Sequence, residues 1–309
     1  MSDAIPEPPR PVLCLGEALV DLICERQIAG LSEADAFVPH FGGVVANIAL
    51  LAARAGARVA LAGASGADEW GEWLQGQLAG AGVELGHFQL MEGERTPLAM
   101  VLIDAHGEAG YTIYGEPAGW VARVVGPRVD ELAESCSGLF LSSNTLVGEE
   151  DRAVTMSLRE RALELDRPVI FDPNLRLHRW RSRTDAAASA NACVPGALLV
   201  RANLAEAALM TREDDPERVA QALLKAGARN VVITLGAEGA MLRGSFRANV
   251  PGVAVRGRLL STVGAGDALT ATLIAQLALA GWYEPAIAAG LSAGVREAAR
   301  ACERWGATD

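Results

Sequence analysis

The residues best suited to chemistry form a glycine-rich run, Ser261-Thr262-Val263-Gly264-Ala265-Gly266-Asp267, which leads into an apolar helix predicted from Ala268 to about Ala280. A helix N-terminus has backbone N–H groups without partners, and its aligned peptide dipoles add roughly half a positive charge. An anionic group such as a phosphate could approach the bare amides of Gly264, Ala265 and Gly266, with the Asp267 carboxylate beside it. These residue types suit phosphoryl transfer to an alcohol, in which amides hold the developing charge and a carboxylate accepts the hydroxyl proton.

The same run also fits a plain turn with an acidic N-cap, which stabilises a helix by about 1 kcal/mol. Polar clusters elsewhere in the chain favour the chemical interpretation. They follow predicted strands at Asp172-Pro173-Asn174-Leu175-Arg176, at Asn203-Leu204-Ala205-Glu206 and at Thr234-Leu235-Gly236-Ala237-Glu238-Gly239. Because parallel strands end at one edge of a sheet, these clusters should converge on a single site.

The predicted elements alternate between strands and helices, which is typical of a doubly wound, mainly parallel α/β sheet flanked by helices. Strands are expected at 12–15, 58–62, 139–142, 169–172, 198–200 and 231–235, and the last helix at about 284–303. Two further β-rich segments, 98–104 and 109–114, resemble a hairpin and stand apart from this alternation. They predict a small accessory sheet that covers the site, or a surface hairpin without a function.

Two loops near the N-terminus carry further candidates. The first strand should end at Gly16-Glu17, where a loop carrying Asp21 is expected. Gly42-Gly43 allows close backbone approach to a ligand and precedes a helix to about Ala55, with Asn47 in its first turns. Asn47 is either a site residue or an exposed polar residue. A further loop, 63–68, should cap a helix at 69–79.

Composition excludes several classes of function. The 309 residues are 50% hydrophobic, and a formal net charge of −11 argues against binding to nucleic acid or to anionic membranes. The proline-rich start, Met1 to Pro11, is predicted to be a disordered leader and not a signal peptide, and the uncharged runs are too short to span a membrane. A soluble, cytoplasmic protein is therefore expected.

Neither metal-ligand clusters nor the usual phosphate-binding lysines are evident. The five cysteines and four histidines lack the spacing of a disulfide framework or a zinc site, so buried free thiols are expected. Lys225 is the single lysine and Ala226 follows it, which excludes a Walker A loop and the strand lysine of protein kinases. A phosphate site would have to use backbone amides, arginine and metal.

Taken together, these residues resemble the ribokinase-like (PfkB) family of carbohydrate kinases over nearly the whole chain. Gly42-Gly43 with Asn47, and the run from Thr262 to Asp267, match the two family signatures in order and separation. The remaining matches are Gly16-Glu17 with Asp21, Asp172 to Arg176 with Trp180, Asn203 with Glu206, and Thr234 to Gly239. The set is most similar to the fructokinase and 2-keto-3-deoxygluconate kinase branch.

The resemblance implies one domain, residues 1–309, with a β-sheet lid formed by insertions at about 17–40 and 96–118. It implies transfer of the γ-phosphoryl group of ATP to a primary hydroxyl of a sugar. By position, Asp267 would be the catalytic base and Gly264, Ala265 and Gly266 the anion hole. The sugar would be held by Asp21, Gly42, Gly43, Asn47 and Arg176. The nucleotide would be held by Asn203, Glu206, Thr234, Gly236 and Gly239, with Glu206 reaching Mg²⁺ through water.

Two departures from the family pattern affect these expectations. Ser261 stands where the family usually has Asp, and in many members that carboxylate helps to bind an activating monovalent cation. The requirement for potassium is therefore left open. Leu269 replaces a family Phe, a packing change that we expect to be tolerated. Pairing of lids between two chains would suit a homodimer.

Arg176 has three possible roles: a bidentate clamp on a substrate carboxylate, a phosphate contact, or a brace that holds its loop through backbone carbonyls. Its basic neighbours Arg179, Arg181 and Arg183 are interpreted as a solvated loop.

The predicted function is an ATP-dependent ketohexose kinase acting on fructose, with a 2-keto-3-deoxygluconate kinase as the alternative. A dinucleotide-binding oxidoreductase is disfavoured because Leu269 stands where its fingerprint needs Gly or Ala. A regulatory protein that binds sugar or nucleotide without turnover is a further alternative. Ser261 is the motif change that favours it, whereas Asp267 and the glycines are intact.

Overall fold

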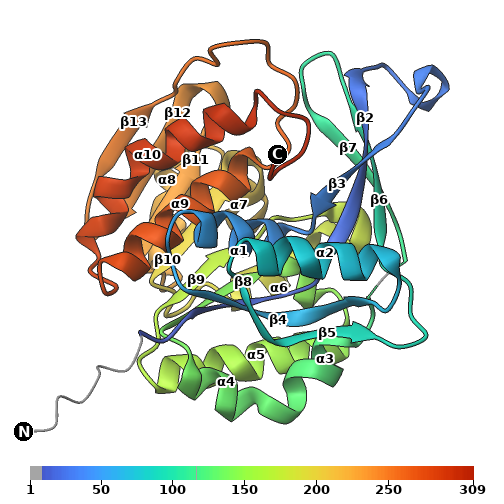
Figure 1. Cartoon of the computed structure of the whole chain (residues 1–309). Helices are drawn as coiled ribbons and strands as arrows, with labels where there is room; N and C mark the ends of the chain where they lie inside the picture. Colours follow the sequence, from blue (N-terminus) through green and yellow to red (C-terminus); the bar gives the residue numbers. More distant parts are fainter. Residues whose placement is uncertain (1–8, 116) are drawn as a thin grey trace, which may run out of the picture.

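A nine-stranded sheet forms the centre of the computed structural model, which describes residues 9–115 and 117–309 (Figure 1). All neighbouring strands from β11 to β5 pair in parallel, whereas β12 and β13 are antiparallel. The strand order is β13 (Ala248–Pro251), β12 (Gly239–Gly244), β11 (Asn230–Thr234), β10 (Leu199–Asn203), β9 (Val169–Asp172), β8 (Gly138–Ser142), β1 (Val12–Leu15), β4 (Val59–Gly66) and β5 (Glu84–Met91). The predicted mainly parallel α/β sheet is confirmed.

The order of these strands places a crevice at the middle of the sheet. The chain adds β4 and β5 on one side of β1, and β8 to β11 on the other. Ligands in open α/β sheets bind at such a switch point, outside the carboxyl ends of the strands. The strands β1, β8 and β9 are buried along their whole length, as expected for a sheet that helices cover on both faces.

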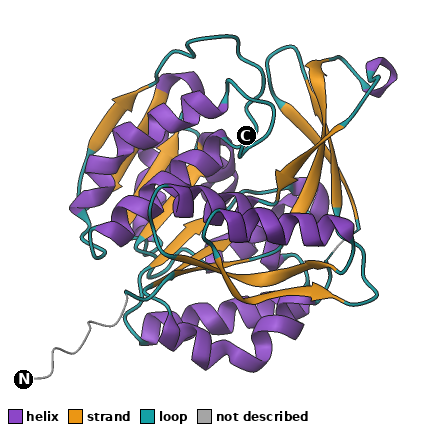
Figure 2. Cartoon of the chain, in the orientation of Figure 1, coloured by secondary structure: helices purple, strands orange, loops and turns teal. Residues whose placement is uncertain are grey.

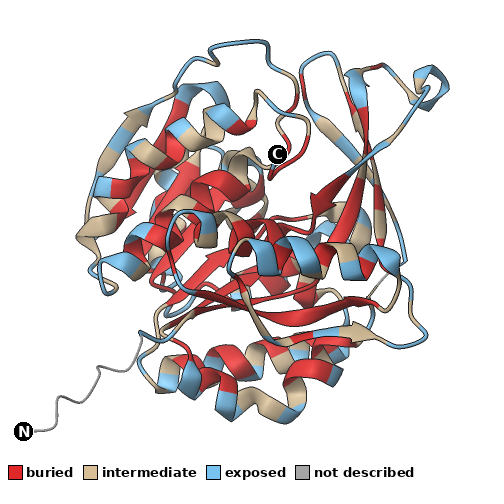
Figure 3. Ribbon diagram, viewed as in Figure 1, coloured by how far each residue is buried: buried red, intermediate tan, exposed pale blue. Residues whose placement is uncertain are grey.

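Helices cover both faces of the sheet and bury its side chains (Figures 2 and 3). One apolar cluster joins the sheet to α1 (Val44–Arg54), α2 (Glu69–Gly80), α9 (Ala265–Leu279) and α10 (Pro285–Ala301). The other joins it to α3 (Trp120–Val125), α4 (Val129–Ser135), α5 (Glu149–Glu164), α6 (Arg183–Ala192), α7 (Leu204–Thr211) and α8 (Pro216–Lys225). None of the described helices is long and apolar enough to cross a membrane.

Helix α9 is buried over most of its length. It is apolar around most of its circumference and packs against both α1 and α10. A helix with this composition is stable only when protein surrounds it. Its N-terminus is thereby fixed at the crevice. Single 3₁₀ turns lie in the loops at η1 (Leu31–Glu33), η2 (Gly126–Arg128), η3 (Ser143–Leu146), η4 (Leu177–Arg179) and η5 (Gly236–Glu238).

A separate four-stranded sheet stands beside the central one, in the order β3 (Val38–Gly42), β2 (Leu19–Gln27), β6 (Leu98–Ile103) and β7 (Ala109–Tyr114) (Figure 1). The predicted hairpin is confirmed, because β6 and β7 form an antiparallel pair. Its own apolar cluster includes Val263 and Ala307 from the C-terminal part of the chain. Of the predicted lid segments, residue 116 lies outside the described residues, as do residues 1–8 of the predicted leader.

Several predicted boundaries were wrong. Asp21 lies within strand β2 and not in a loop, because β2 is an inner strand whose backbone pairs with both β3 and β6. Strand β4 continues to Gly66, through most of the predicted capping loop. Helix α9 begins at Ala265, since the left-handed φ of 75° at Gly264 ends the turn directly before it. Strands β5, β12 and β13 were not predicted.

Candidate active site

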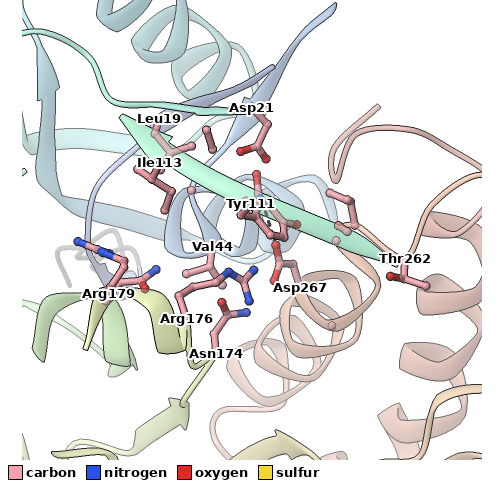
Figure 4. Close-up of a pocket in the computed structure, with 18 of the residues that line it drawn as sticks. Leu19, Asp21, Val44, Tyr111, Ile113, Asn174, Arg176, Arg179, Thr262 and Asp267 are labelled. Carbon is pink, nitrogen blue, oxygen red and sulfur yellow. Dashed lines mark hydrogen bonds between the residues drawn. The ribbon is translucent and has the colours of Figure 1, made fainter. Parts of the chain in front are cut away.

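A cavity of about 240 Å³ lies at the carboxyl ends of the central strands, where the small sheet faces the start of α9 (Figure 4). It brings together segments from the whole length of the chain. Its lining residues are Glu17, Leu19, Asp21, Gly43, Val44, Asn47, Ala99, Glu108, Ala109, Tyr111, Ile113, Asn144, Asn174, Arg176, Arg179, Arg201, Asn203, Glu206, Thr262, Val263, Gly264, Gly266 and Asp267.

Asp267 and Asn47 meet at the centre of this cavity. The Asn47 amide of α1 donates a hydrogen bond of 2.9 Å to Oδ2 of Asp267, in the first turn of α9. In the described part of the chain no hydrogen bond engages Oδ1, so this oxygen is available to a hydroxyl group of a substrate. Burial raises the pKa of Asp267 to about 6, although the bond from Asn47 opposes this rise.

Asp21 approaches the cavity from the small sheet. Its strand runs beside β3, and a Cβ atom added at Gly42 would lie 2.6 Å from the Asp21 carboxyl carbon. A side chain at position 42 would therefore displace the Asp21 carboxylate. Burial raises the pKa of Asp21 to about 7; the guanidinium of Arg176 lowers it, and the carboxylate of Asp267 raises it.

Arg176 and Tyr111 pack against each other on the wall of the cavity (Figure 4). The guanidinium carbon of Arg176 lies 4.6 Å from the centre of the Tyr111 ring, a cation–π distance. Within the described residues, no hydrogen bond or ion pair engages this half-buried guanidinium. Its charge instead faces the carboxylates of Asp21, Glu206 and Asp267. An unpartnered cation in a cavity is suited to an anionic group of a ligand.

A buried network supports the glycine turn, defined here as Gly264 to Gly266. Arg201 of β10 donates hydrogen bonds of 3.0 Å to Asp172 and to Thr234. The same oxygen of Asp172 accepts a hydrogen bond of 2.8 Å from Thr270 of α9. A Cβ atom added at Gly266 would lie 2.7 Å from the Arg201 guanidinium. Arg201 therefore lies directly against the turn.

A family profile described as pfkB family carbohydrate kinase matches residues 10–302. The chain belongs to this family of carbohydrate kinases. Fructokinase-1 from Oryza sativa subsp. japonica is 31% identical to it over 268 residues, which cover 86% of this chain and 82% of that protein. The predicted family is confirmed, and the carbohydrate kinase activity follows from it.

Solved structures of related kinases share the fold. A double mutant of Vibrio cholerae fructokinase with fructose, ADP and potassium ion bound is 25% identical, with a TM-score of 0.79 over 97% of this chain and 94% of that one. Aminoimidazole riboside kinase from Salmonella enterica, complexed with aminoimidazole riboside and an ATP analog, has a TM-score of 0.82. It is 23% identical, with 96% of this chain and 95% of that one covered.

The predicted residues of the carbohydrate kinase fall into two groups. Those that line the cavity are Asp21, Gly43, Asn47, Arg176, Asn203, Glu206, Gly264, Gly266 and Asp267. Those outside its lining are Gly42, Thr234, Gly236, Gly239 and Ala265. Gly42 lies against the carboxyl group of Asp21, and the Thr234 hydroxyl accepts a hydrogen bond from Arg201. Both residues therefore contact side chains that line the cavity. Gly236 and Gly239 flank the turn between β11 and β12, and their role toward a nucleotide stays a prediction.

Asn203 and Glu206 of the kinase form a capping box at the start of α7. The Asn203 side chain accepts from the Glu206 amide, and Glu206 Oε2 accepts from the Asn203 amide. Glu206 Oε1 accepts from the Leu175 amide at 2.9 Å, which ties the loop after β9 to α7. Burial raises the pKa of Glu206, and the charge of Asp172 adds to this effect.

The interpretation of Arg179 as part of a solvated loop was wrong. Its side chain is 8% exposed, lines the cavity and lies 3.8 Å from the carboxylate of Glu17. The 3₁₀ turn after Arg176 folds this side chain inward, whereas Arg181 and Arg183 are exposed. Sequence reasoning also missed Tyr111 and Arg201. The absence of usable lysines, which makes arginine necessary at a phosphate site, was a signal that could have identified Arg201.

Substituting Gly266 by alanine should impair the kinase although alanine favours helices. The new methyl group would push the Arg201 guanidinium away from the turn, so we expect turnover to fall by at least about tenfold. The matched control is Gly76→Ala in α2, where a Cβ atom meets nothing within 4 Å. That change should raise stability by about 0.5–1 kcal/mol. Steady-state ADP release and thermal unfolding measure both effects; equal turnover in the two variants contradicts the contact.

Proposed function

We propose that this carbohydrate kinase transfers the γ-phosphoryl group of ATP to a primary hydroxyl of a ketohexose, with fructose as its substrate. The observation that carries the proposal is the open Oδ1 of Asp267 next to Gly264 and Gly266 of the glycine turn, within one cavity. The amide between them, that of Ala265, donates to the Thr262 carbonyl. Fructokinases among the relatives support the choice of sugar. The ATP analog and ADP bound in related kinases support the choice of nucleotide.

The proposed reaction assigns one step to each part of the cavity. Asp267 Oδ1 accepts the proton of the sugar hydroxyl. At the same time the oxygen of that hydroxyl forms a bond to the γ-phosphorus. The bond from the γ-phosphorus to the bridging oxygen of ADP breaks, and ADP leaves with its electron pair. The amides of the glycine turn and the dipole of α9 stabilise the charge on the transferred group. Asp21, Gly43 and Asn47 hold the sugar, and the small sheet acts as a lid that excludes water.

Magnesium fits this arrangement through its water shell. Mg²⁺ retains several waters when it binds nucleotide phosphates, so it needs oxygen acceptors near the site. Asn203 and Glu206 line the cavity, but each Glu206 oxygen already accepts a backbone N–H group. They would hold the ion through water molecules. The bound ion would neutralise charge at the phosphates.

A sugar acid is the second candidate substrate because of Arg176. Its guanidinium has no hydrogen-bond partner among the described residues and lies beside Asp21 and Asp267. A carboxylate such as that of 2-keto-3-deoxygluconate would satisfy this group in a bidentate pair. With a neutral ketose, the same group would be left to contact phosphate.

The test is a coupled ADP-release assay with MgATP and fructose, 2-keto-3-deoxygluconate, ribose or adenosine. Saturable turnover with fructose as the best substrate is the expected result. A preference for the sugar acid would transfer the assignment to the alternative and make Arg176 its carboxylate clamp. ADP release with none of the four would overturn the proposal and support the regulatory interpretation.

The pH dependence of this assay reports on Asp267. A base must be ionised, and burial raises its pKa to about 6, so kcat at saturating sugar should fall below pH 6, approaching tenfold per pH unit. Burial raises the pKa of Asp21 to about 7, and its protonation should change KM for the sugar. An aspartate with the ordinary value of 3.8 would keep its activity to about pH 4. Asn47→Ala removes the hydrogen bond that lowers this pKa, so its acid limb should move to higher pH. Circular dichroism at each pH separates this effect from unfolding.

A further inference from the structure

Ser261 connects the glycine turn to the C-terminal segment, defined here as Trp305 to Asp309. Its side chain is completely buried. The hydroxyl donates a hydrogen bond of 3.1 Å to the carbonyl of Trp305 and accepts one of 3.0 Å from the Val263 amide. A single hydroxyl thus joins the residue before the turn to a segment more than forty positions away in the chain.

The C-terminal segment is itself fixed on three sides. A Cβ atom added at Gly264 would collide with Ala307, so the segment lies directly against the glycine turn. The Thr308 carbonyl accepts a hydrogen bond of 2.6 Å from Arg54 at the end of α1. The Asp309 carboxylate lies 3.0 Å from His40 of the small sheet and accepts a bond of 2.8 Å from the Gly306 amide. The segment therefore links the turn, α1 and the small sheet.

The oxygen atoms beside Ser261 do not suit a bound monovalent cation. Such an ion needs several oxygen ligands, and a buried cation is costly unless a negative charge compensates it. Serine provides no charge, and its proton is directed at the Trp305 carbonyl. The nearby carboxylates are engaged, Glu108 by the Thr262 hydroxyl and Asp309 by Gly306 and His40.

We propose that the hydrogen bonds of Ser261, together with the packing of Ala307 against Gly264, hold the glycine turn in place, so that this kinase needs no monovalent cation. A related fructokinase has been crystallised with potassium, which makes the difference testable between relatives. Ser261 is a positioning residue in this proposal, since it acts through the turn and does not touch the substrate. The proposal rests on the proposed function for its nucleotide and for its turnover measurement.

The first measurement is MgADP affinity by calorimetry in tetramethylammonium, sodium and potassium chloride at constant ionic strength. The wild-type Kd should agree within about twofold in the three salts, because the turn is already held. ADP release with the accepted sugar should agree equally well. A wild-type Kd that tightens about tenfold or more in potassium would overturn the proposal. This readout needs no sugar, so it remains decisive even if the proposed acceptor is wrong.

Variants at Ser261 separate positioning from general destabilisation. Ser261→Asp places an unpaired carboxylate in the buried site, so MgADP should bind at least about tenfold more weakly in tetramethylammonium and recover in potassium. Ser261→Ala removes both hydrogen bonds, so affinity should fall equally in all three salts. Ser261→Thr keeps the hydroxyl and should restore wild-type behaviour. If the Asp variant does not fold, the wild-type comparison in the three salts still tests the proposal. If Ser261→Ala binds MgADP with wild-type affinity in every salt, the hydrogen bonds of Ser261 have no role in holding the turn.

Discussion

Replacing Asp267 by asparagine should reduce turnover by about 10²- to 10⁴-fold, the contribution that a general base typically makes. The amide cannot accept the hydroxyl proton, but its oxygen can still accept the hydrogen bond from Asn47. Sugar and nucleotide should therefore bind with nearly unchanged affinity. Single-turnover phosphoryl transfer and calorimetric binding, measured on the same preparation, test both parts.

The stability of this variant provides the control. Because burial raises the pKa of Asp267 to about 6, folding disfavours its ionised form at neutral pH. A neutral amide removes that cost, so Tm should stay the same or increase at pH 7. Turnover within a few-fold of the wild type would show that another group takes the proton. A marked decrease in Tm would mean that the loss of activity is a folding defect.

Replacing Arg201 by leucine should destabilise the protein by about 3–5 kcal/mol, the usual effect of breaking a buried ion pair. The Arg201 and Asp172 side chains are 7% and 0% exposed, and the other oxygen of Asp172 already lacks a partner. Removing the guanidinium leaves this carboxylate buried and uncompensated. Denaturant unfolding at neutral pH measures the change in the free energy of unfolding.

An exposed ion pair is the matched control for Arg201. The side chains of Arg26 and Asp35 are 53% and 63% exposed, so Arg26→Leu should cost about 0–1 kcal/mol. The double variant with Arg201→Leu and Asp172→Leu should recover part of the lost stability, because the Asp172 carboxylate is no longer left buried without its partner. A loss at Arg201 no larger than that at Arg26 would contradict the buried network.

Much of the fold followed from local sequence patterns. Apolar runs such as 12–15 and 169–172 became the buried parallel strands, since a strand covered on both faces must be apolar along its length. The predicted capping of helix α2 by residues 63–68 is confirmed at Asp68, because its side chain accepts from the Gly71 amide. Strands β2 and β3 were harder to predict, since pairing between separate segments stabilises them.

The site residues likewise divide into those with a local sequence signal and those placed by contacts between distant segments. The sequence by itself determined the amides of the glycine turn, the carboxylate of Asp267 and the polar residues at the strand ends, because helix starts and strand ends carry local signals. Only the tertiary structure decided that Arg176 faces Tyr111, that Arg201 supports Gly266, and that Ser261 bonds to Trp305. These contacts join segments that are distant in the chain, and burial, which sets the pKa of Asp267, depends on how all of them pack.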